Sequence, residues 1–202
     1  MKPSELFKEL TAKTGLYNIQ AIDNIPSIIE RGLLSHERAG DTDHTSIAME
    51  DVQQRRNTVF IPNGMPLHKY ANLYFSSWNP MLSARRNENE NICILWVDSA
   101  VLDIEGAVIS DRYASSEYAG FYSPMEGLQV IDFDMIYARS WMDDNRYEYL
   151  KKKSIKCAEV LVPYWISYAY IIGAAVVSEN AKDRMKTLGF DKQIYVKPEA
   201  FF

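Results

Sequence analysis

The stretch Lys151-Lys-Lys-Ser-Ile-Lys-Cys-Ala-Glu-Val-Leu-Val-Pro-Tyr-Trp-Ile166 changes from a basic run into an apolar, β-branched segment that contains one carboxylate, Glu159. Because side chains alternate along a strand, a strand over residues 155–162 places Glu159 on the same face as Cys157 and Leu161. A carboxylate among apolar neighbours either pairs with a cation or belongs to a functional site. The alternative is a surface glutamate on an edge strand, and the pattern alone does not decide between the two.

The composition is that of a globular protein. Of the 202 residues, 47% are hydrophobic and 24% are charged, so we expect a single folded domain over residues 1–202 rather than a disordered or fibrous chain. No run approaches the roughly 20 apolar residues that a membrane-spanning helix needs, and the first fifteen residues are too polar for a signal peptide. We therefore expect a cytoplasmic protein with no membrane partner.

The net charge and the two cysteines narrow the possible class of protein further. The net charge of −5 argues against a protein that coats nucleic acid non-specifically, although a local basic groove remains compatible with it. Cys93 and Cys157 lie in apolar runs without a further Cys or His at metal-ligand spacing, so we expect buried free thiols, no disulfide and no metal. Three short basic clusters, Arg55-Arg56, Arg85-Arg86 and Lys151-Lys-Lys with Lys156, are each by themselves more typical of a solvated face.

Short helices and strands alternate along the chain. Periodicity, caps and breakers predict helices over residues 4–12, 24–32, 46–57, 79–86, 132–139 and 179–188. Further strands are expected over residues 16–20, 73–77, 92–97, 107–110, 169–178 and 193–197, with loops over residues 35–45, 59–70 and 115–127. Because these elements lack βαβ regularity, we expect an α+β fold.

The chemistry-bearing residues favour one kind of site. No glycine-rich phosphate loop, His-rich metal spacing or Gly-x-Ser-x-Gly elbow is present, and the three histidines, His36, His44 and His68, lie in or beside predicted loops. An arginine pair, many aromatic residues and Glu159 remain. Cleavage of the glycosidic bond to nicotinamide builds positive charge on a ribose, which a carboxylate stabilises, while an arginine holds a pyrophosphate. The residues alone leave this as one hypothesis among several.

Six segments form an ordered pattern along the chain: Ser46-Ile-Ala-x-x-x-Val-Gln-x-Arg-Arg-Asn57, Leu67-His-x-Tyr-x-x-x-Tyr-Phe75, Pro80-Met-Leu82, Ser110-Asp-Arg112, Ser140-Trp141 and Lys152-x-x-x-x-Cys-Ala-Glu-Val-Leu-Val162. Taken in this order, they resemble the DarT family of DNA ADP-ribosyltransferase toxins. The resemblance covers residues 16–202. No single segment is specific, and it is their order and spacing that carry the resemblance.

The resemblance implies an ADP-ribosyltransferase-like fold with mixed central sheets, and NAD as a co-substrate without a metal. It implies transfer of ADP-ribose to thymine or guanine of single-stranded DNA, and an antitoxin that removes ADP-ribose from DNA. Its catalytic residues fall on Glu159 and Arg56. The NAD-binding positions implied are Tyr17, Asn18, Ile19, Asn24, Leu33, Arg56, Tyr74, Phe75 and Met81. The DNA-binding positions implied are Arg55, Arg112, Tyr113, Trp141, Lys152 and Lys153, with residues 139–156 as the substrate-recognition segment.

Two departures from the family pattern leave the target base open. Members often carry Tyr-His where this chain has Tyr17-Asn18, and a histidine where this chain has Tyr113. Two other hypotheses also remain: a transferase acting on RNA or protein, and a non-catalytic nucleic-acid-binding module on the same fold. Structural roles compete as well, since Arg56 can end a helix and Tyr74, Phe75 and Trp141 can be packing residues.

Overall fold

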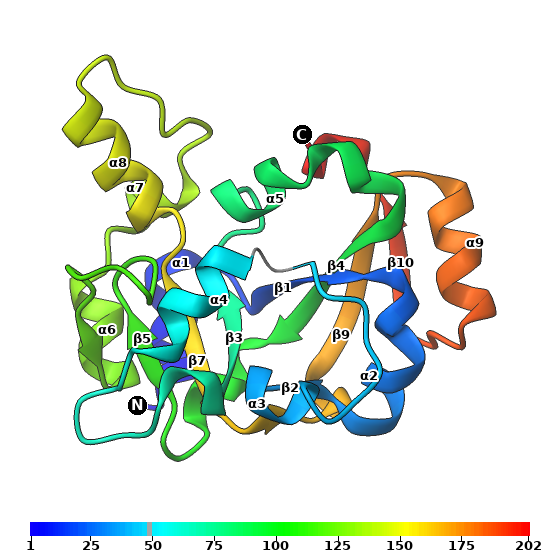
Figure 1. Cartoon of the computed structure of the whole chain (residues 1–202), viewed down its shortest axis with the longest axis horizontal. Helices are drawn as coiled ribbons and strands as arrows, with labels where there is room; N and C mark the ends of the chain where they lie inside the picture. The colour runs from blue at the N-terminus through cyan, green and yellow to red at the C-terminus, as the bar shows by residue number, and fades with distance from the viewer. Residues whose placement is uncertain (48–49) are drawn as a thin grey trace.

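The structure is a computed structural model that describes residues 1–47 and 50–202. Within these residues the strands form an eight-stranded sheet in the order β10-β9-β4-β1-β3-β7-β5-β6 and a two-stranded sheet, β2-β8 (Figure 1). The pair β9-β10 is parallel and the other pairs are antiparallel. The strands are β1 (Gly15–Ala21), β2 (Leu33–Leu34), β3 (Tyr70–Tyr74), β4 (Ile92–Asp98), β5 (Val108–Ser110), β6 (Phe121–Tyr122), β7 (Glu159–Pro163), β8 (Trp165–Ile166), β9 (Ile171–Val176) and β10 (Gln193–Val196).

Short helices surround the large sheet, with α9 beside β10 at one end and α6 beside β5 at the other (Figure 1). The α-helices are α1 (Pro3–Thr11), α2 (Ile25–Arg31), α3 (His36–Ala39), α4 (Glu50–Asn57), α5 (Pro80–Ala84), α6 (Pro124–Val130), α7 (Phe133–Tyr137), α8 (Arg146–Ile155) and α9 (Glu179–Thr187). The 3-10 helices are η1 (Ile22–Asn24), η2 (Leu67–Lys69), η3 (Arg86–Asn91), η4 (Ser99–Asp103), η5 (Tyr168–Tyr170) and η6 (Pro198–Ala200). No helix among the described residues is long and apolar enough to cross a bilayer.

The large sheet opens in its middle. Register pairs join β1 to β4 along the whole strand, whereas the single pair Tyr17–Tyr74 joins β1 to β3. The sheet therefore consists of two halves, β10-β9-β4-β1 and β3-β7-β5-β6. The two halves are joined at the pair Tyr17–Tyr74 and separate beyond it. The Asn18 side-chain amide donates to the Asn72 carbonyl across the opening, at 3.0 Å. Backbone groups that would pair in a continuous sheet need other partners here, from side chains or from a ligand.

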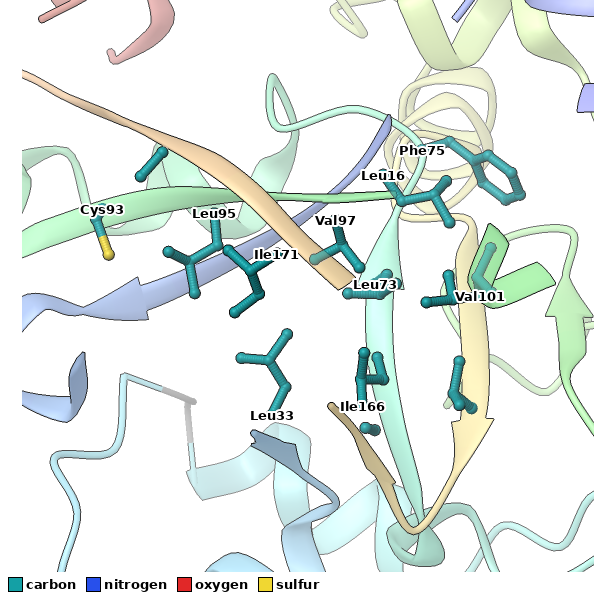
Figure 2. Packing of buried hydrophobic residues seen from close by; sticks show 14 of the residues in the cluster. Leu16, Leu33, Leu73, Phe75, Cys93, Leu95, Val97, Val101, Ile166 and Ile171 are labelled. Atoms are coloured by element: carbon teal, nitrogen blue, oxygen red, sulfur yellow. The ribbon is translucent and has the colours of Figure 1, made fainter. Parts of the chain in front are cut away.

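The two faces of the large sheet differ. The main core fills one face, where residues of β1, β3 and β4 such as Leu16, Leu73 and Leu95 meet Leu33 and Ile166 of the small sheet (Figure 2). The helices α1, α2, α6, α7 and α9 each contribute buried side chains to this core. A smaller cluster on the opposite face contains Ile19, Tyr74, Ile94 and Cys157. Helix α5 packs on this second face through Leu82 and Met81.

Most predicted elements are confirmed. The helices expected over residues 4–12, 24–32, 79–86, 132–139 and 179–188 are α1, α2, α5, α7 and α9, and the strands β1, β4, β5, β9 and β10 lie where they were expected. The strand expected over residues 73–77 lies earlier, as β3. The helix expected over residues 46–57 is α4, and residues 48 and 49 lie outside the described residues. Both cysteines are buried free thiols, as predicted.

The strand predicted over residues 155–162 is wrong in its first part. Residues up to Ile155 belong to α8, and the strand begins at Glu159. The side chain of Asn145 caps α8 by accepting from the backbone N–H groups of Tyr147 and Glu148. A cap residue followed by good helix formers indicates a helix. In residues 146–155 this local preference is stronger than the β-branched pattern that follows.

The loop predicted over residues 115–127 is also wrong in part, because it contains β6 and the beginning of α6. The helix was missed in the sequence because it contains Gly127, and a glycine lowers helix propensity. In the structure a Cβ at Gly127 would lie 2.6 Å from the Cβ of Ile109, so the glycine is needed for close packing of α6 against β5. A tertiary contact of this kind leaves no mark in the local sequence.

Candidate active site

A buried ion pair lies beside the opening of the large sheet. Glu159, the first residue of β7, is 0% exposed, and Arg56 of α4 is 6% exposed. The Nη1 group of Arg56 donates to both carboxylate oxygens of Glu159 at 3.0 Å, and the backbone N–H of Ala114 donates to Oε1 at 3.0 Å. Charge-assisted bonds of this kind fix the orientation of a carboxylate. Glu159 is therefore not a surface residue, and Arg56 pairs with it.

Electrostatics keep Arg56 charged. Burial acts to lower its pKa, but the negative charge of Glu159 and the hydrogen bond between them outweigh burial, so the pKa of Arg56 is raised. The pKa of the Tyr74 hydroxyl is raised well above its usual value, first by burial and then by Glu159. Burial and Glu159 also raise the pKa of the Cys157 thiol to about 12. Tyr74 and Cys157 therefore stay protonated at neutral pH, and neither is a thiolate or phenolate nucleophile.

The strand register places three of the predicted site residues in one row. Glu159 is the partner of Tyr74 on β3, and Tyr74 is the partner of Tyr17 on β1. Directly opposite residues of an antiparallel pair carry their side chains on the same face, with Cβ atoms about 4.5–5.5 Å apart. Ile19, Met81 and Tyr113 pack in the same cluster as this row. The structure thus gathers most of the predicted residues on the face opposite the main core.

Two predicted residues lie elsewhere. Phe75 turns to the main core, where its ring lies 5.8 Å from the rings of Phe7 and Phe133. Leu33 is buried in the same core, in the small sheet. Their side chains belong to the face opposite Tyr74, so a contact with a ligand at Glu159 would have to come from their backbones.

Asn18 and Asn24 organise the chain around the opening. Asn18 bridges β1 and β3, and its buried Oδ1 has no hydrogen-bond partner among residues 1–47 and 50–202. Asn24 accepts from the backbone N–H of Thr45 at 2.8 Å and donates to the Thr45 carbonyl at 2.9 Å. This second amide fixes the segment that precedes α4 and Arg56. An unpaired buried amide oxygen such as that of Asn18 suits a ligand that donates a hydrogen bond.

The sequence did not point to two features of this site. The Ala114 N–H that holds Glu159 is a backbone group, so no residue type announces it. His36 and His68 stack with ring centroids 4.1 Å apart, although they are distant in the sequence. Burial, followed by the nearby charges of His36 and Arg56, lowers the pKa of His68 to about 4, so the imidazole is neutral at pH 7.

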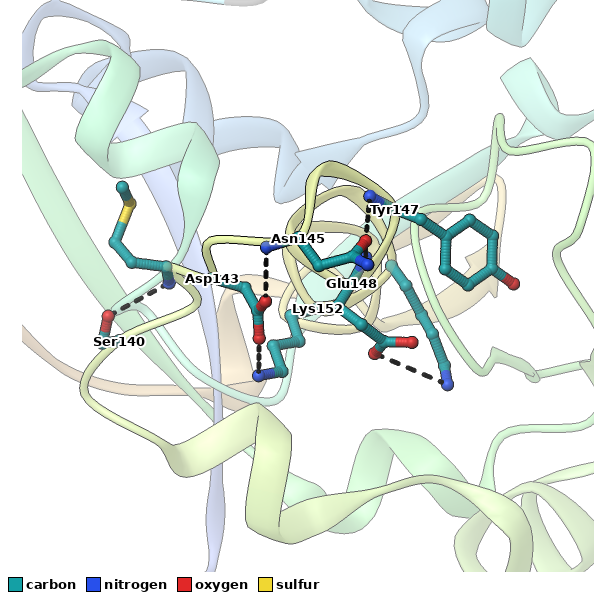
Figure 3. A network of polar contacts seen from close by, with 8 residues as sticks. Ser140, Asp143, Asn145, Tyr147, Glu148 and Lys152 are labelled. Carbon is teal, nitrogen blue, oxygen red and sulfur yellow. Dashed lines mark hydrogen bonds and ion pairs between the residues drawn. The ribbon is translucent and has the colours of Figure 1, made fainter.

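The predicted DNA-binding residues differ in what they contact. Arg112 forms two hydrogen bonds with Asp111, at 3.1 and 3.0 Å, and Lys152 donates to Asp143 at 2.6 Å (Figure 3). Arg55 is exposed on α4, and Tyr113 is half-buried beside the Glu159 face. Trp141 and Lys153 line one pocket between α5 and α8. Acidic partners thus neutralise Arg112 and Lys152, whereas Trp141 and Lys153 face a cavity.

No group of three or more His, Cys, Asp or Glu side chains that could hold a metal ion occurs in residues 1–47 and 50–202. The site as described is an ion pair, a row of aromatic residues and an opening in the sheet.

The fold is that of an ADP-ribosyltransferase. The structure superimposes on DarT of Thermus sp. 2.9 in complex with ADP-ribosylated ssDNA with a TM-score of 0.79 and 27% identity, covering 94% of this chain and 96% of that one. Thermus sp. 2.9 DarT in complex with NAD+ gives a TM-score of 0.78 and 25% identity, covering 94% of this chain and 98% of that one. The predicted fold is confirmed.

The chain belongs to the DarT family, because the family model described as "ssDNA thymidine ADP-ribosyltransferase, DarT" matches residues 17–202. A DNA ADP-ribosyl transferase of Thermus sp. (strain 2.9) is 30% identical over an alignment of 183 residues, and the match covers 85% of this chain and 85% of that protein. A DNA ADP-ribosyl transferase-DNA ADP-ribosyl glycohydrolase fusion protein of Thermosipho africanus is 28% identical over an alignment of 195 residues. That match covers 93% of this chain and 48% of the fusion protein, so the chain spans about half the length of that relative.

Proposed function

We propose that this chain, as a single domain over residues 1–202, is the toxin of a toxin–antitoxin pair and transfers ADP-ribose from NAD to a base of single-stranded DNA. The observation that carries the proposal is the buried Glu159–Arg56 pair beside the opening of the sheet, in a chain of the DarT family. A non-catalytic binding module has no use for this pair, because burying two charges costs free energy that only a need for their charge or orientation compensates.

Glu159 acts on the sugar. In the transfer step a base atom forms a bond to the ribose C1′, the bond from C1′ to nicotinamide breaks, and nicotinamide leaves neutral with the bonding electron pair. The attacked base then loses one proton to solvent water. Positive charge grows on the ribose before the new bond is complete, and a carboxylate held in place stabilises that charge without reorganising. The bonds from Arg56 and Ala114 supply this preorganisation.

Arg56 holds Glu159 and faces the phosphates. A guanidinium carries five N–H donors in a rigid fork, and the contacts with Glu159 use only its Nη1 group. Tyr17 and Tyr74 form the floor on which nicotinamide and its ribose lie, and Asn18 offers its unpaired Oδ1 to a ligand N–H or hydroxyl.

The acceptor is tested by mass spectrometry. A short single-stranded DNA that contains thymine and no guanine, incubated with the protein and NAD, is expected to gain the mass of one ADP-ribose. We propose thymine because the family description names thymidine. A matched oligonucleotide with guanine and no thymine, an RNA of the same sequence and a protein mixture serve as the comparison. Modification of RNA or protein alone would overturn the proposal, and modification of the guanine oligonucleotide alone would overturn the choice of base.

We expect a complementary strand to suppress the reaction by about two orders of magnitude. A stacked, paired base cannot present its Watson–Crick edge to the ribose without being flipped out, which costs a few kcal/mol, and about 1.4 kcal/mol corresponds to a tenfold rate. The measurement compares one oligonucleotide alone and annealed to its complement, with an annealed duplex that carries a single-stranded overhang containing the same target as the control. Equal rates on the single strand and the full duplex would contradict single-strand recognition.

We further propose that an antitoxin with DNA ADP-ribosyl glycohydrolase activity reverses the modification, in the cytoplasm where NAD and DNA occur together. Support comes from the Thermosipho africanus relative, in which a transferase and a glycohydrolase form one protein. If co-expression of such a glycohydrolase leaves growth inhibition by this chain unchanged, the partnership is wrong.

A further inference from the structure

Two of the three basic clusters in the sequence meet at one cavity. A pocket of about 220 Å³ lies between α5 and α8. It is lined by Pro80, Ser83, Ala84, Arg86, Trp141, Tyr149 and Lys153. The lining contains two cations and two aromatic rings and no carboxylate, in a chain whose net charge is −5. That combination suits an anion attached to a flat ring.

The cations that face the pocket are those without an acidic partner. In the first cluster Arg85 pairs with Glu88 at 2.9 Å, whereas within the described part of the chain Arg86 forms no ion pair and donates only to the Ser83 carbonyl, at 3.4 Å. In the second cluster Lys151 lies 3.9 Å from Glu148, and Lys152 pairs with Asp143 (Figure 3).

Lys153 has no ion pair among residues 1–47 and 50–202 either, and its ammonium lies 5.7 Å from the centre of the Tyr149 ring. The uncompensated charges of Arg86 and Lys153 are therefore directed to the same cavity, whereas Lys156 of the second cluster is buried and donates to the carbonyls of Ile136 and Ala138.

The pocket lies at the end of the sheet that carries the active site. The helix α5 follows β3, which ends at Tyr74, and α8 precedes β7, which begins at Glu159. Because β3 and β7 are antiparallel and Tyr74 is the register partner of Glu159, both helices leave the sheet at the same end. Figure 1 shows α5 and α8 on one side of the molecule.

Contacts with other aromatic residues hold the Trp141 ring in place. The Trp141 ring meets the Phe202 ring edge-on, with centroids 5.8 Å apart, and Phe202 in turn stacks on Trp78 at 3.9 Å. The Trp78 indole donates to the Arg139 carbonyl at 2.8 Å. These contacts pack Trp141 against Phe202 and connect residues 139–141 to Trp78. This wall of the pocket is therefore preorganised.

We propose that this pocket binds a nucleotide of the DNA acceptor strand that flanks the modified one, with its phosphate on Arg86 and Lys153 and its base against Trp141 and Tyr149. The inference rests on the proposed function and adds a subsite to it. Cations that track the backbone and rings on which bases stack are the combination by which proteins hold single strands. A flanking nucleotide is the occupant because the reacting base has to lie at Glu159, beyond the pocket.

The test is a pair of double variants. Arg86→Ala/Lys153→Ala removes the two uncompensated cations, and Arg85→Ala/Lys151→Ala removes their already paired neighbours and serves as the matched control. For a single strand, log K falls with log salt by about 0.7 for each phosphate contact. The first variant is therefore expected to weaken binding of a fluorescent single-stranded oligonucleotide about fivefold at 0.1 M salt and to lower the salt slope by about 0.7, because one phosphate contact is lost. We expect less than a threefold change for the control.

If Arg86 and Lys153 had only a structural role, the two double variants would not differ in this way. The subsite does not contact NAD, so the affinity for NAD and kcat at saturating DNA are expected to stay at the parent's values, while KM for DNA rises. Trp141→Ala is expected to weaken binding on the order of tenfold without a change in the salt slope, since stacking releases no ions. Equal weakening by both double variants, or parent-like binding by Arg86→Ala/Lys153→Ala in a protein that modifies DNA, would overturn the subsite. Failure of the parent itself to modify any oligonucleotide would instead overturn the proposed function.

Discussion

Glu159→Gln is expected to lower the rate of ADP-ribose transfer by at least about 10²–10³-fold, while the affinity for NAD changes less than threefold. A stabilising group preorganised for charge that develops in the transition state contributes about that factor. Because the interaction is made mainly in the transition state, its loss lowers kcat far more than it weakens ground-state binding. Single-turnover transfer to a labelled oligonucleotide and calorimetric titration with NAD measure the two quantities.

The choice of glutamine keeps the fold. Its amide oxygen can still accept from Arg56 and Ala114, the groups that hold the carboxylate in the parent. Removing one charge of a buried pair nevertheless leaves the other uncompensated, which costs up to about 3–5 kcal/mol, so thermal unfolding has to be recorded alongside. Glu117→Gln, at an exposed glutamate, is the control and is expected to be parental. A folded Glu159→Gln variant with parental turnover would remove Glu159 from the mechanism, and a loss of NAD affinity equal to the loss of rate would make it a binding residue.

The sequence predicted the elements with strong local signals. Helix α2 carries a proline in its first turn and Gly32 just past its end, and α5 has Asn79 as a cap, whose side chain accepts from the backbone N–H of Leu82. The alternation around Glu159 was also right from the strand's beginning onward, since Ala158, Val160 and Val162 face the main core. Local chemistry determined these elements, and tertiary contacts did not override it.

What the sequence could not show depends on tertiary contacts. The opening between β1 and β3 arises because only Tyr17 and Tyr74 pair, and register is not visible in a single strand. The pairing of Arg56 with Glu159 joins residues far apart in the chain, and the resemblance named both residues without placing them in contact. The sequence also could not show which cations of the basic clusters have an acidic partner. Lys152 and Lys153 are adjacent, and only Lys152 pairs with Asp143.

Arg56→Lys is expected to lose activity by about 10²–10³-fold even though it preserves the charge. The Arg56 guanidinium spans both oxygens of Glu159 from one nitrogen and has further donors in a fixed plane for phosphates, whereas an ammonium is a compact point charge on a flexible stem. Burial also works against the substitute. An arginine stays protonated in this site, but a buried lysine shifts its pKa downward and is neutralised far more readily.

The two effects can be separated by pH. If the lysine loses activity because it becomes neutral, transfer should recover as pH falls through its lowered pKa; if the planar fork is what matters, activity should stay low at every pH at which the protein is folded. We expect the second result, together with weakened binding of NAD, because we propose that Arg56 contacts the phosphates of NAD as well as Glu159. Arg31→Lys, an exposed arginine beside Glu30, is the control for the exchange itself and is expected to be parental. Arg56→Lys with near-parental kcat and NAD affinity would mean that Arg56 supplies charge alone, and that the orientation of Glu159 depends on the Ala114 N–H instead.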